Sequence, residues 1–155
     1  MACFSGTARK TRHKLTQRAR EAGLEGTYPI GALIVGPDGT ILSRGHNQVY
    51  SVGDYSAHAE VDTIRRAGGV LMAPLYRGKC TLYTTLEPCL MCAGALLMAN
   101  IARVIWAAND LDYGALRTFL PGRALPYIIR SSTYDCVPRS RSRGSLPGID
   151  GSMDC

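Results

Sequence analysis

The sequence has few long apolar segments, and we expect none of them to direct the chain into a membrane or out of the cell. Its N-terminus is polar and has no apolar core of the kind found in secretory signals, so we expect no such signal and a cytoplasmic location. The longest charge-free apolar stretch, residues 88–102, is too short to span a membrane and therefore predicts a core helix. Internal repeats are also absent, and 155 residues fit one compact domain.

Acidic residues are in the minority. The sequence has 12 Asp and Glu against 18 Lys and Arg, which gives a formal net charge of +6. The basic residues concentrate in two segments, 8–20 and 139–143. Such a surplus fits either a surface that binds phosphate-bearing partners, including nucleic acid, or simple solubilising charge. Both interpretations stay open from the sequence.

Turn residues and the spacing of apolar residues predict an α/β chain. Helices are expected at residues 8–22, 58–67 and 89–99, the last hydrophobic almost all round and therefore central. A hairpin is expected from strands 30–35 and 41–45, followed by a loop at 47–56. Further strands are expected at 81–86, 103–108 and 126–130. Because helices connect strands in the second half, parallel pairing is expected there.

The composition changes after residue 130. Ser, Arg, Gly and Pro dominate there and few apolar residues remain, so residues 131–155 are expected to form a flexible tail. We therefore predict one domain at residues 1–130 followed by this tail.

Two of the six cysteines, Cys89 and Cys92, stand at the expected start of the third helix. Residues three apart share one side of a helix, so both sulfurs can reach one ion, and the positive helix end favours thiolate. His58 stands at the start of another helix. Two thiolates and an imidazole suit Zn²⁺ and leave a fourth position for water, as a catalytic site requires. For an isolated Cys-x-x-Cys motif, a redox pair or half of a structural zinc site is the alternative.

Glu60 lies two residues after His58, a spacing that normally sends side chains to different sides of a helix. In the first turn, however, both can face an ion near the end of the helix axis. Glu60 would then stay outside the metal shell, where its carboxylate can take a proton from water and deliver it to a leaving amine. His-x-Glu followed by Pro-Cys-x-x-Cys is the known signature of zinc deaminases, which this sequence matches.

On these motifs the chain resembles the cytidine deaminase superfamily, in the branch of tRNA adenosine, cytosine and guanine deaminases. The similarity extends from Leu15 to Ala115 and is carried most specifically by residues 56–60 (SAHAE) and 84–95 (TTLEPCLMCAGA). Residues 29–32 (PIGA) and 45–47 (GHN) are similar to that branch's first-strand and substrate-loop motifs. The resemblance implies a three-layer α/β/α sandwich with a five-stranded mixed sheet, and a homodimer or larger assembly.

The resemblance also implies substrate-binding positions. Asn47 would hydrogen-bond the bound base, because an amide offers both donors and an acceptor; a loop-capping role is the alternative. Leu86, Glu87 and the main chain near Ala32 would border the pocket. Asp110 would lie near the backbone of an RNA substrate, as in the tRNA enzymes, with a turn cap as the alternative.

Two features depart from the tRNA enzymes. Those enzymes carry a basic C-terminal helix, whereas the segment after residue 130 has no helical apolar pattern, and the loop at 112–126 also differs. Trp106 and Tyr113 have rings that can stack on a base, although the apolar neighbours of Trp106 favour a core position.

The working hypothesis is therefore zinc-dependent hydrolytic deamination of a small nucleobase or nucleoside, with release of ammonia. The alternatives are a tRNA adenosine-to-inosine deaminase and, in another class, a non-catalytic zinc module that binds nucleic acid.

Overall fold

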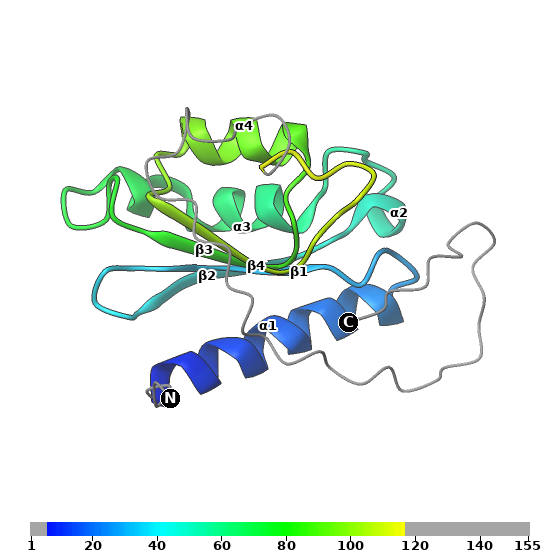
Figure 1. Cartoon of the computed structure of the whole chain (residues 1–155), viewed down its shortest axis with the longest axis horizontal. Coiled ribbons are helices and arrows are strands. Elements are labelled where there is room, and N and C mark those ends of the chain that lie inside the picture. Colours follow the sequence, from blue (N-terminus) through cyan, green and yellow to red (C-terminus); the bar gives the residue numbers. More distant parts are fainter. Residues whose placement is uncertain (1–5, 117–155) are drawn as a thin grey trace.

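The described part of the chain is built around one mixed β-sheet (Figure 1). The computed structural model describes residues 6–116, with side chains from residue 11 onward. Four strands in this part form the sheet, in the order β2-β1-β3-β4. Strand β1 pairs antiparallel with β2 and with β3, and β3 pairs parallel with β4. The strands are β1 (Gly31–Val35), β2 (Ile41–His46), β3 (Thr81–Leu86) and β4 (Arg103–Ala108).

The predicted hairpin and the predicted parallel pair are both confirmed. The hairpin joins β1 to β2, with Gly31 opposite His46. The parallel pair is β3 and β4, which are connected by a helix. The sequence predicts five strands, and residues 6–116 contain four of them. The fifth, expected at 126–130, lies outside the described residues, as does the tail expected at 131–155.

Helices lie on both faces of the sheet. Figure 1 shows α1 along one face, whereas α3 and α4 lie over the other. None of the helices in residues 6–116 combines the length and apolar character that crossing a bilayer requires. The helical segments are α1 (Gly6–Leu24), α2 (Val49–Val52), α3 (Ala59–Ala67), the 3-10 turn η1 (Gly68–Met72) and α4 (Leu90–Met98). The single turn α2 falls in the segment that the sequence predicts as a loop.

Two glycines fix how α1 ends and how it packs. The helix closes with Gly26 in the left-handed region (φ 75°), and the Thr27 amide donates back to the Ala22 carbonyl at 3.1 Å. This arrangement is a Schellman motif, in which glycine avoids a Cβ clash. At Gly31, a Cβ atom would lie 2.7 Å from the backbone nitrogen of Ala19. Glycine there allows α1 to lie directly against β1.

The core lies largely between the sheet and the helices α3 and α4. Trp106 is only 2% exposed, and its indole N–H donates to the Asn109 side-chain oxygen at 3.2 Å, so the predicted core position is confirmed. Cys80 is also buried and packs as a small apolar residue. The core residues are Ala32, Ile34, Ala59, Ala67, Leu71, Cys80, Leu82, Ala93, Leu96, Ile101, Val104, Trp106, Ala115 and Leu116.

Helix α4 is not central, and that prediction is wrong. One side of the helix is buried through Cys92, Ala93 and Leu96. The other side leaves Met98 84% exposed and Leu90 60% exposed. Apolar residues all round the helix therefore reflect two different surfaces, one against the core and one on the outside of the described fold.

At Gly45 on β2, helix α3 packs directly against the sheet. A Cβ there would lie 2.7 Å from both the Ala59 carbonyl oxygen and the Thr63 amide nitrogen, and closer still to the Thr63 hydroxyl. We expect Gly45→Ala to lower the free energy of unfolding by about 1–3 kcal/mol, because α3 must shift. Denaturant unfolding measures the change. As a control, Gly94→Ala on α4, with nothing within 4 Å, should raise stability by about 0.5–1 kcal/mol. Wild-type stability in Gly45→Ala would contradict this packing.

Candidate active site and metal centre

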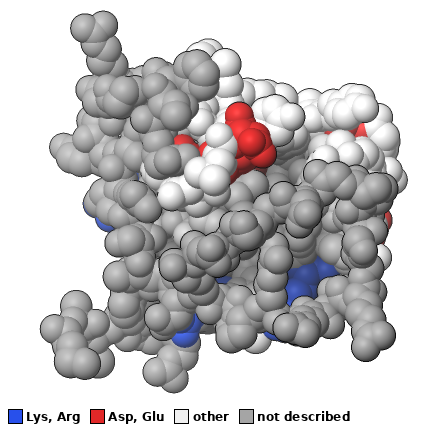
Figure 2. Space-filling model, turned by 45° about the vertical axis from the view of Figure 1, so that its right-hand side comes forward, with Lys and Arg blue, Asp and Glu red and all other residues white. Residues whose placement is uncertain are grey.

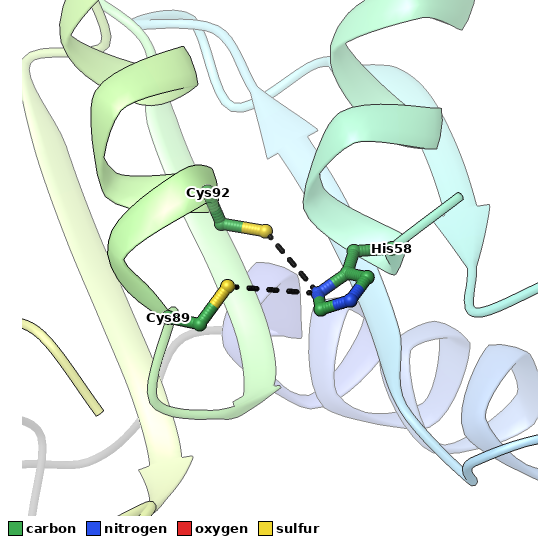
Figure 3. Close-up of side chains that lie close together, drawn as sticks. All are labelled: His58, Cys89 and Cys92. Atoms are coloured by element: carbon green, nitrogen blue, oxygen red, sulfur yellow. Dashed lines mark hydrogen bonds between the residues drawn. The ribbon is translucent and has the colours of Figure 1, made fainter. Parts of the chain in front are cut away.

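The candidate site is formed where the N-termini of α3 and α4 meet. His58 is the N-cap residue of α3 and Cys89 is the N-cap residue of α4, each with an extended backbone. Neither side chain caps its own helix, so both are directed into the space between the helices (Figure 3). Cys92 follows in the first turn of α4. The expectation that each motif opens a helix is therefore confirmed.

The three predicted metal ligands converge. The ligand atoms of His58, Cys89 and Cys92 all lie within 4.8 Å of one another. The His58 Nδ1 atom is 3.7 Å from the Cys89 sulfur and 3.6 Å from the Cys92 sulfur. Tetrahedral zinc, with Zn–N near 2.05 Å and Zn–S near 2.3 Å, places such N and S atoms about 3.6 Å apart. The donor set and its spacing therefore fit a zinc ion.

The two thiols have opposite pKa shifts. The hydrogen bond with Cys92 lowers the pKa of Cys89 to about 4, and His58 contributes in the same direction. The same hydrogen bond, together with burial, raises the pKa of Cys92. The pKa of His58 is raised, chiefly by its hydrogen bond with Cys89. A divalent cation would displace the proton of the Cys92 thiol, because only the thiolate form binds metal.

Glu60 lies beside this cluster, in the first turn of α3, and is only 3% exposed. Its two oxygens have different neighbours. Oε1 accepts a hydrogen bond from the Thr84 hydroxyl at 2.8 Å, and Oε2 accepts one from the Cys92 thiol at 3.4 Å. Burial raises the pKa of Glu60. His58 and Glu60 thus both contact the Cys92 sulfur from the start of α3.

Asn47 is buried at the end of β2 with its amide oxygen fully engaged. Oδ1 accepts hydrogen bonds from the Thr27 hydroxyl at 2.6 Å and from the Val49 amide at 3.1 Å. The amide nitrogen Nδ2 is buried, and no described residue accepts a hydrogen bond from it. The contact with Val49 fits a loop cap, and the unpaired nitrogen fits a hydrogen bond to a ligand.

Ala32 and Glu87 are both buried, one on β1 and the other directly after β3. The Ala32 carbonyl accepts a hydrogen bond from the Thr63 hydroxyl at 3.2 Å. The Glu87 carboxylate accepts one from the backbone amide of Asp110 at 3.3 Å. A Cβ on Gly114 would lie 2.6 Å from the Glu87 Oε2 atom. Glu87 therefore holds the segment that follows β4, which fits local backbone orientation better than catalysis.

Asp110 caps a turn in that segment. Its Oδ1 atom accepts hydrogen bonds from the backbone amides of Asp112 at 3.0 Å and Tyr113 at 2.9 Å. This geometry favours the turn-cap alternative for Asp110. The segment then returns to the site, because Gly114 forms a β-bridge with Cys89. The beginning of the loop expected at 112–126 thus lies against a predicted metal ligand, and the part from residue 117 lies outside the described residues.

Sequence reasoning missed two hydroxyls that hold predicted site residues. Thr84 binds Glu60, and Thr27 binds Asn47. Thr84 lies within the motif TTLEPC, next to the cysteines, so its position in the motif was a usable signal. Thr27 lies 20 residues from Asn47 in a segment without a motif, and only the folded chain brings the two together.

Comparison with known proteins agrees with this geometry. A profile of the family described as the cytidine and deoxycytidylate deaminase zinc-binding region matches residues 7–108. The chain therefore belongs to this family, and the resemblance predicted from the motifs is confirmed.

Individual relatives differ in the substrate that their names state. A tRNA-specific adenosine deaminase from Aquifex aeolicus is 41% identical over 100 residues, which cover 64% of this chain and 65% of that protein. A solved structure from a study of A-to-I editing by tRNA:A34 deaminases has a TM-score of 0.68 and 32% identity, and the match covers 80% of this chain and 98% of that one. Guanine deaminase from Bacillus subtilis has a TM-score of 0.59 and 39% identity, with 70% and 68% covered. The chain spans between 17% and 65% of the length of three curated relatives that it matches.

Proposed function

We propose that the chain is a zinc-dependent hydrolase that deaminates a nucleobase, free or within a nucleoside or RNA. The observation that carries this proposal is that a set of possible metal ligands and a buried carboxylate lie next to each other. His58, Cys89 and Cys92 offer a ligand set that fits zinc. The Glu60 carboxylate lies against Cys92, with one oxygen facing the cluster and the other held by Thr84.

The roles of the residues follow from their contacts. Zinc held by His58, Cys89 and Cys92 would act as a Lewis acid that activates a water molecule near neutral pH. Glu60 Oε2 would take one proton from the attacking water and pass it to the ring nitrogen. It would then pass the second proton of that water, from the hydroxyl now bonded to the ring carbon, to the leaving amine. A C–O bond forms, the C–N bond to the amine breaks, the ring carbon becomes a carbonyl, and ammonia leaves. Thr84 keeps the carboxylate in place throughout by donating to Oε1.

Asn47 is proposed to orient the base. A buried donor without a partner costs about 1–3 kcal/mol, so a buried amide nitrogen calls for an acceptor. Carbonyl oxygens and unprotonated ring nitrogens of nucleobases are such acceptors. We propose that the main chain at Ala32 and the segment held by Glu87 border the same pocket.

Two substrate classes follow from the relatives. The similarity to a guanine deaminase supports a free nucleobase or a nucleoside, which remains our working hypothesis. The similarity to tRNA adenosine deaminases supports adenosine in a tRNA loop. The basic residues of α1, such as Arg12 and Arg20, lie on the helix that covers the opposite face of the sheet from α3 and α4 (Figure 1). They therefore lie across the sheet from the starts of α3 and α4, and in Figure 2 the visible Lys and Arg atoms lie lower than most of the visible Asp and Glu atoms.

One observation favours the RNA candidate. Tyr28 and Tyr50 lie near Asn47, with hydroxyls 2.9 Å apart and ring centroids 5.4 Å apart. The hydrogen bond with Tyr50 raises the pKa of Tyr28, and burial and the charges of Tyr50, Tyr113 and Tyr55 raise it further. Tyr55 is 85% exposed and Tyr113 is 75% exposed. Exposed aromatic rings are the platform on which proteins stack bases of single-stranded nucleic acid.

A substrate panel separates these candidates. Purified protein loaded with zinc is incubated with cytosine, guanine, adenosine, cytidine and a tRNA anticodon stem-loop, and ammonia release is followed. We expect turnover of at least one free base or nucleoside. Turnover of the stem-loop alone would select the RNA candidate over our working hypothesis. No turnover of any substrate by the zinc-loaded protein would contradict the proposed function.

We further propose the assembly and organisation that the resemblance implies. The exposed side of α4, with Leu90, Met91 and Met98, supports a homodimer, because apolar side chains of this size favour contact with a partner. Light scattering during gel filtration tests this. A fifth strand at 126–130 that completes the three-layer sandwich, and a domain boundary at residue 130, are tested by limited proteolysis with mass spectrometry. A cytoplasmic location remains a prediction.

A further inference from the structure

The linker between α1 and β1 contacts the residue proposed to orient the base. Thr27 is only 3% exposed and Asn47 only 1%. The Thr27 hydroxyl donates to Asn47 Oδ1 at 2.6 Å, which is the shortest hydrogen bond that Asn47 makes among the described residues. The direction of this hydrogen bond decides which end of the amide is left for a ligand.

The surrounding donors fix that direction. The Tyr50 backbone amide points at the Thr27 oxygen at a long 3.5 Å, which leaves the hydroxyl proton for Asn47. The Val49 amide also donates to Asn47 Oδ1. If the Asn47 amide turned over, its NH₂ group would face the Val49 N–H group, donor against donor. The two donors together hold Oδ1 toward the protein and leave Nδ2, which no described residue accepts from, for the substrate.

Thr27 itself is held by the end of α1. The Schellman motif ties its backbone amide to Ala22. Glu25, two residues earlier, contacts the buried His46 ring nitrogen at 3.0 Å. Because His46 directly precedes Asn47, the helix end and the loop that carries Asn47 form one connected unit. The hydroxyl is therefore in place before any substrate arrives.

We propose that Thr27 is a positioning residue that sets the hydrogen-bond polarity of the base pocket. Because the Thr27 hydroxyl donates to Asn47 Oδ1, the Asn47 Nδ2 group faces the pocket as a hydrogen-bond donor. The pocket therefore selects bases that have a hydrogen-bond acceptor at that edge. The proposal rests on the proposed function for its substrate, but the orientation of the Asn47 amide is a property of the protein alone.

Kinetics test the proposal with Thr27→Val, which keeps the side-chain shape and removes the hydroxyl. On the substrate that the panel identifies, we expect KM to rise about tenfold, because the loss corresponds to one oriented hydrogen bond. The value of kcat should change much less, since the chemical step is untouched. Thr27→Ser keeps the hydroxyl and should restore KM. Thr16→Val, the same change on α1 away from the site, is the control. Wild-type KM in Thr27→Val, or equal damage in Thr27→Ser, would overturn the proposal.

A double-mutant cycle separates positioning from general loss of structure. Asn47→Asp replaces the donor nitrogen by an oxygen and should raise KM by itself. If Thr27 acts through Asn47, adding Thr27→Val to Asn47→Asp should raise KM by less than about twofold further, because residues in one hydrogen-bonded network are not additive. Full additivity of the two effects would overturn the proposal.

A readout without turnover keeps this test independent of the proposed function. The sequence has three asparagines, Asn47, Asn100 and Asn109, and two glutamines, so the NMR spectrum of ¹⁵N-labelled full-length protein contains few side-chain NH₂ signals. We expect Thr27→Val to shift the Asn47 NH₂ pair and leave the other two unchanged. An unshifted Asn47 pair would overturn the proposal even if the enzyme is active. A shifted pair with no turnover of any substrate would support Thr27 and contradict the proposed function instead.

Discussion

Glu60→Gln is expected to lower kcat by about 10²–10⁴-fold while the zinc content stays unchanged. Glutamine has the shape of glutamate and can still accept the hydrogen bond from Thr84, so the start of α3 should keep its structure. Its amide cannot take a proton from water or pass one to the leaving amine. Ammonia release on the substrate found in the panel, together with elemental analysis of the same preparation, measures both quantities.

Glu21→Gln is the matched control. Glu21 pairs with Arg18 on the surface of α1, outside the site, and its replacement should leave kcat at the wild-type value. If Glu60→Gln were as active as wild type, Glu60 would not be the proton carrier.

The non-catalytic zinc module makes a different prediction, namely that nucleic-acid binding is present without ammonia release and is unaffected by Glu60→Gln. The two measurements together therefore decide between the enzyme and the module.

Cys89→Ala is expected to lose the zinc and to lower Tm by roughly 10 °C. The ion would connect the starts of two helices, and a ligand that binds only the folded state stabilises that state. With free zinc at about 1,000 times Kd the effect is ~4 kcal/mol. For a chain of this length each kcal/mol shifts Tm by roughly 2–4 °C. Calorimetry of wild type and variant, with and without a chelator, measures it.

Cys80→Ala makes the same chemical change away from the cluster. Cys80 is buried, and its thiol donates to the Tyr76 carbonyl at 3.3 Å, so the variant should lose some stability through packing alone. Its Tm should still fall on chelation, as in wild type, whereas that of Cys89→Ala should not respond. A wild-type Tm in Cys89→Ala would contradict a stabilising ion, and a disulfide between Cys89 and Cys92 in fresh protein would point to redox chemistry.

Local patterns predicted most of the regular structure. Strands β3 and β4 agree with the predicted bounds, because β-branched and aromatic residues run between clear breaks. The turn α2 was not predicted, since its four residues lie among Gly and polar residues and are too few for a helical period. The side of α4 that faces outward could not be predicted either. Hydropathy alone does not distinguish a helix buried on all sides from one with an exposed apolar side.

The grouping of His58, Cys89 and Cys92 with Glu60 was predictable because the match to the zinc deaminase signature pairs the two motifs, while spacing at each helix start makes a shared site geometrically possible. The contacts proposed to position the substrate were less predictable from the sequence. Thr27 meets Asn47 only because α1 ends in a Schellman motif against β1, and Glu87 meets Asp110 only across the end of β4. Such contacts join distant parts of the chain, and one sequence carries no direct record of them.

His58 and Cys89, the two proposed metal ligands at helix N-caps, belong to helices docked on the sheet. Most residues proposed to contact a substrate belong instead to connecting segments around 25–28, 47–56 and 109–116. If the proposed function holds, reaction chemistry and choice of substrate are carried by separable pieces of the chain. Exchange of a connecting segment, by evolution or engineering, would then change the substrate while the proposed metal ligands keep their places.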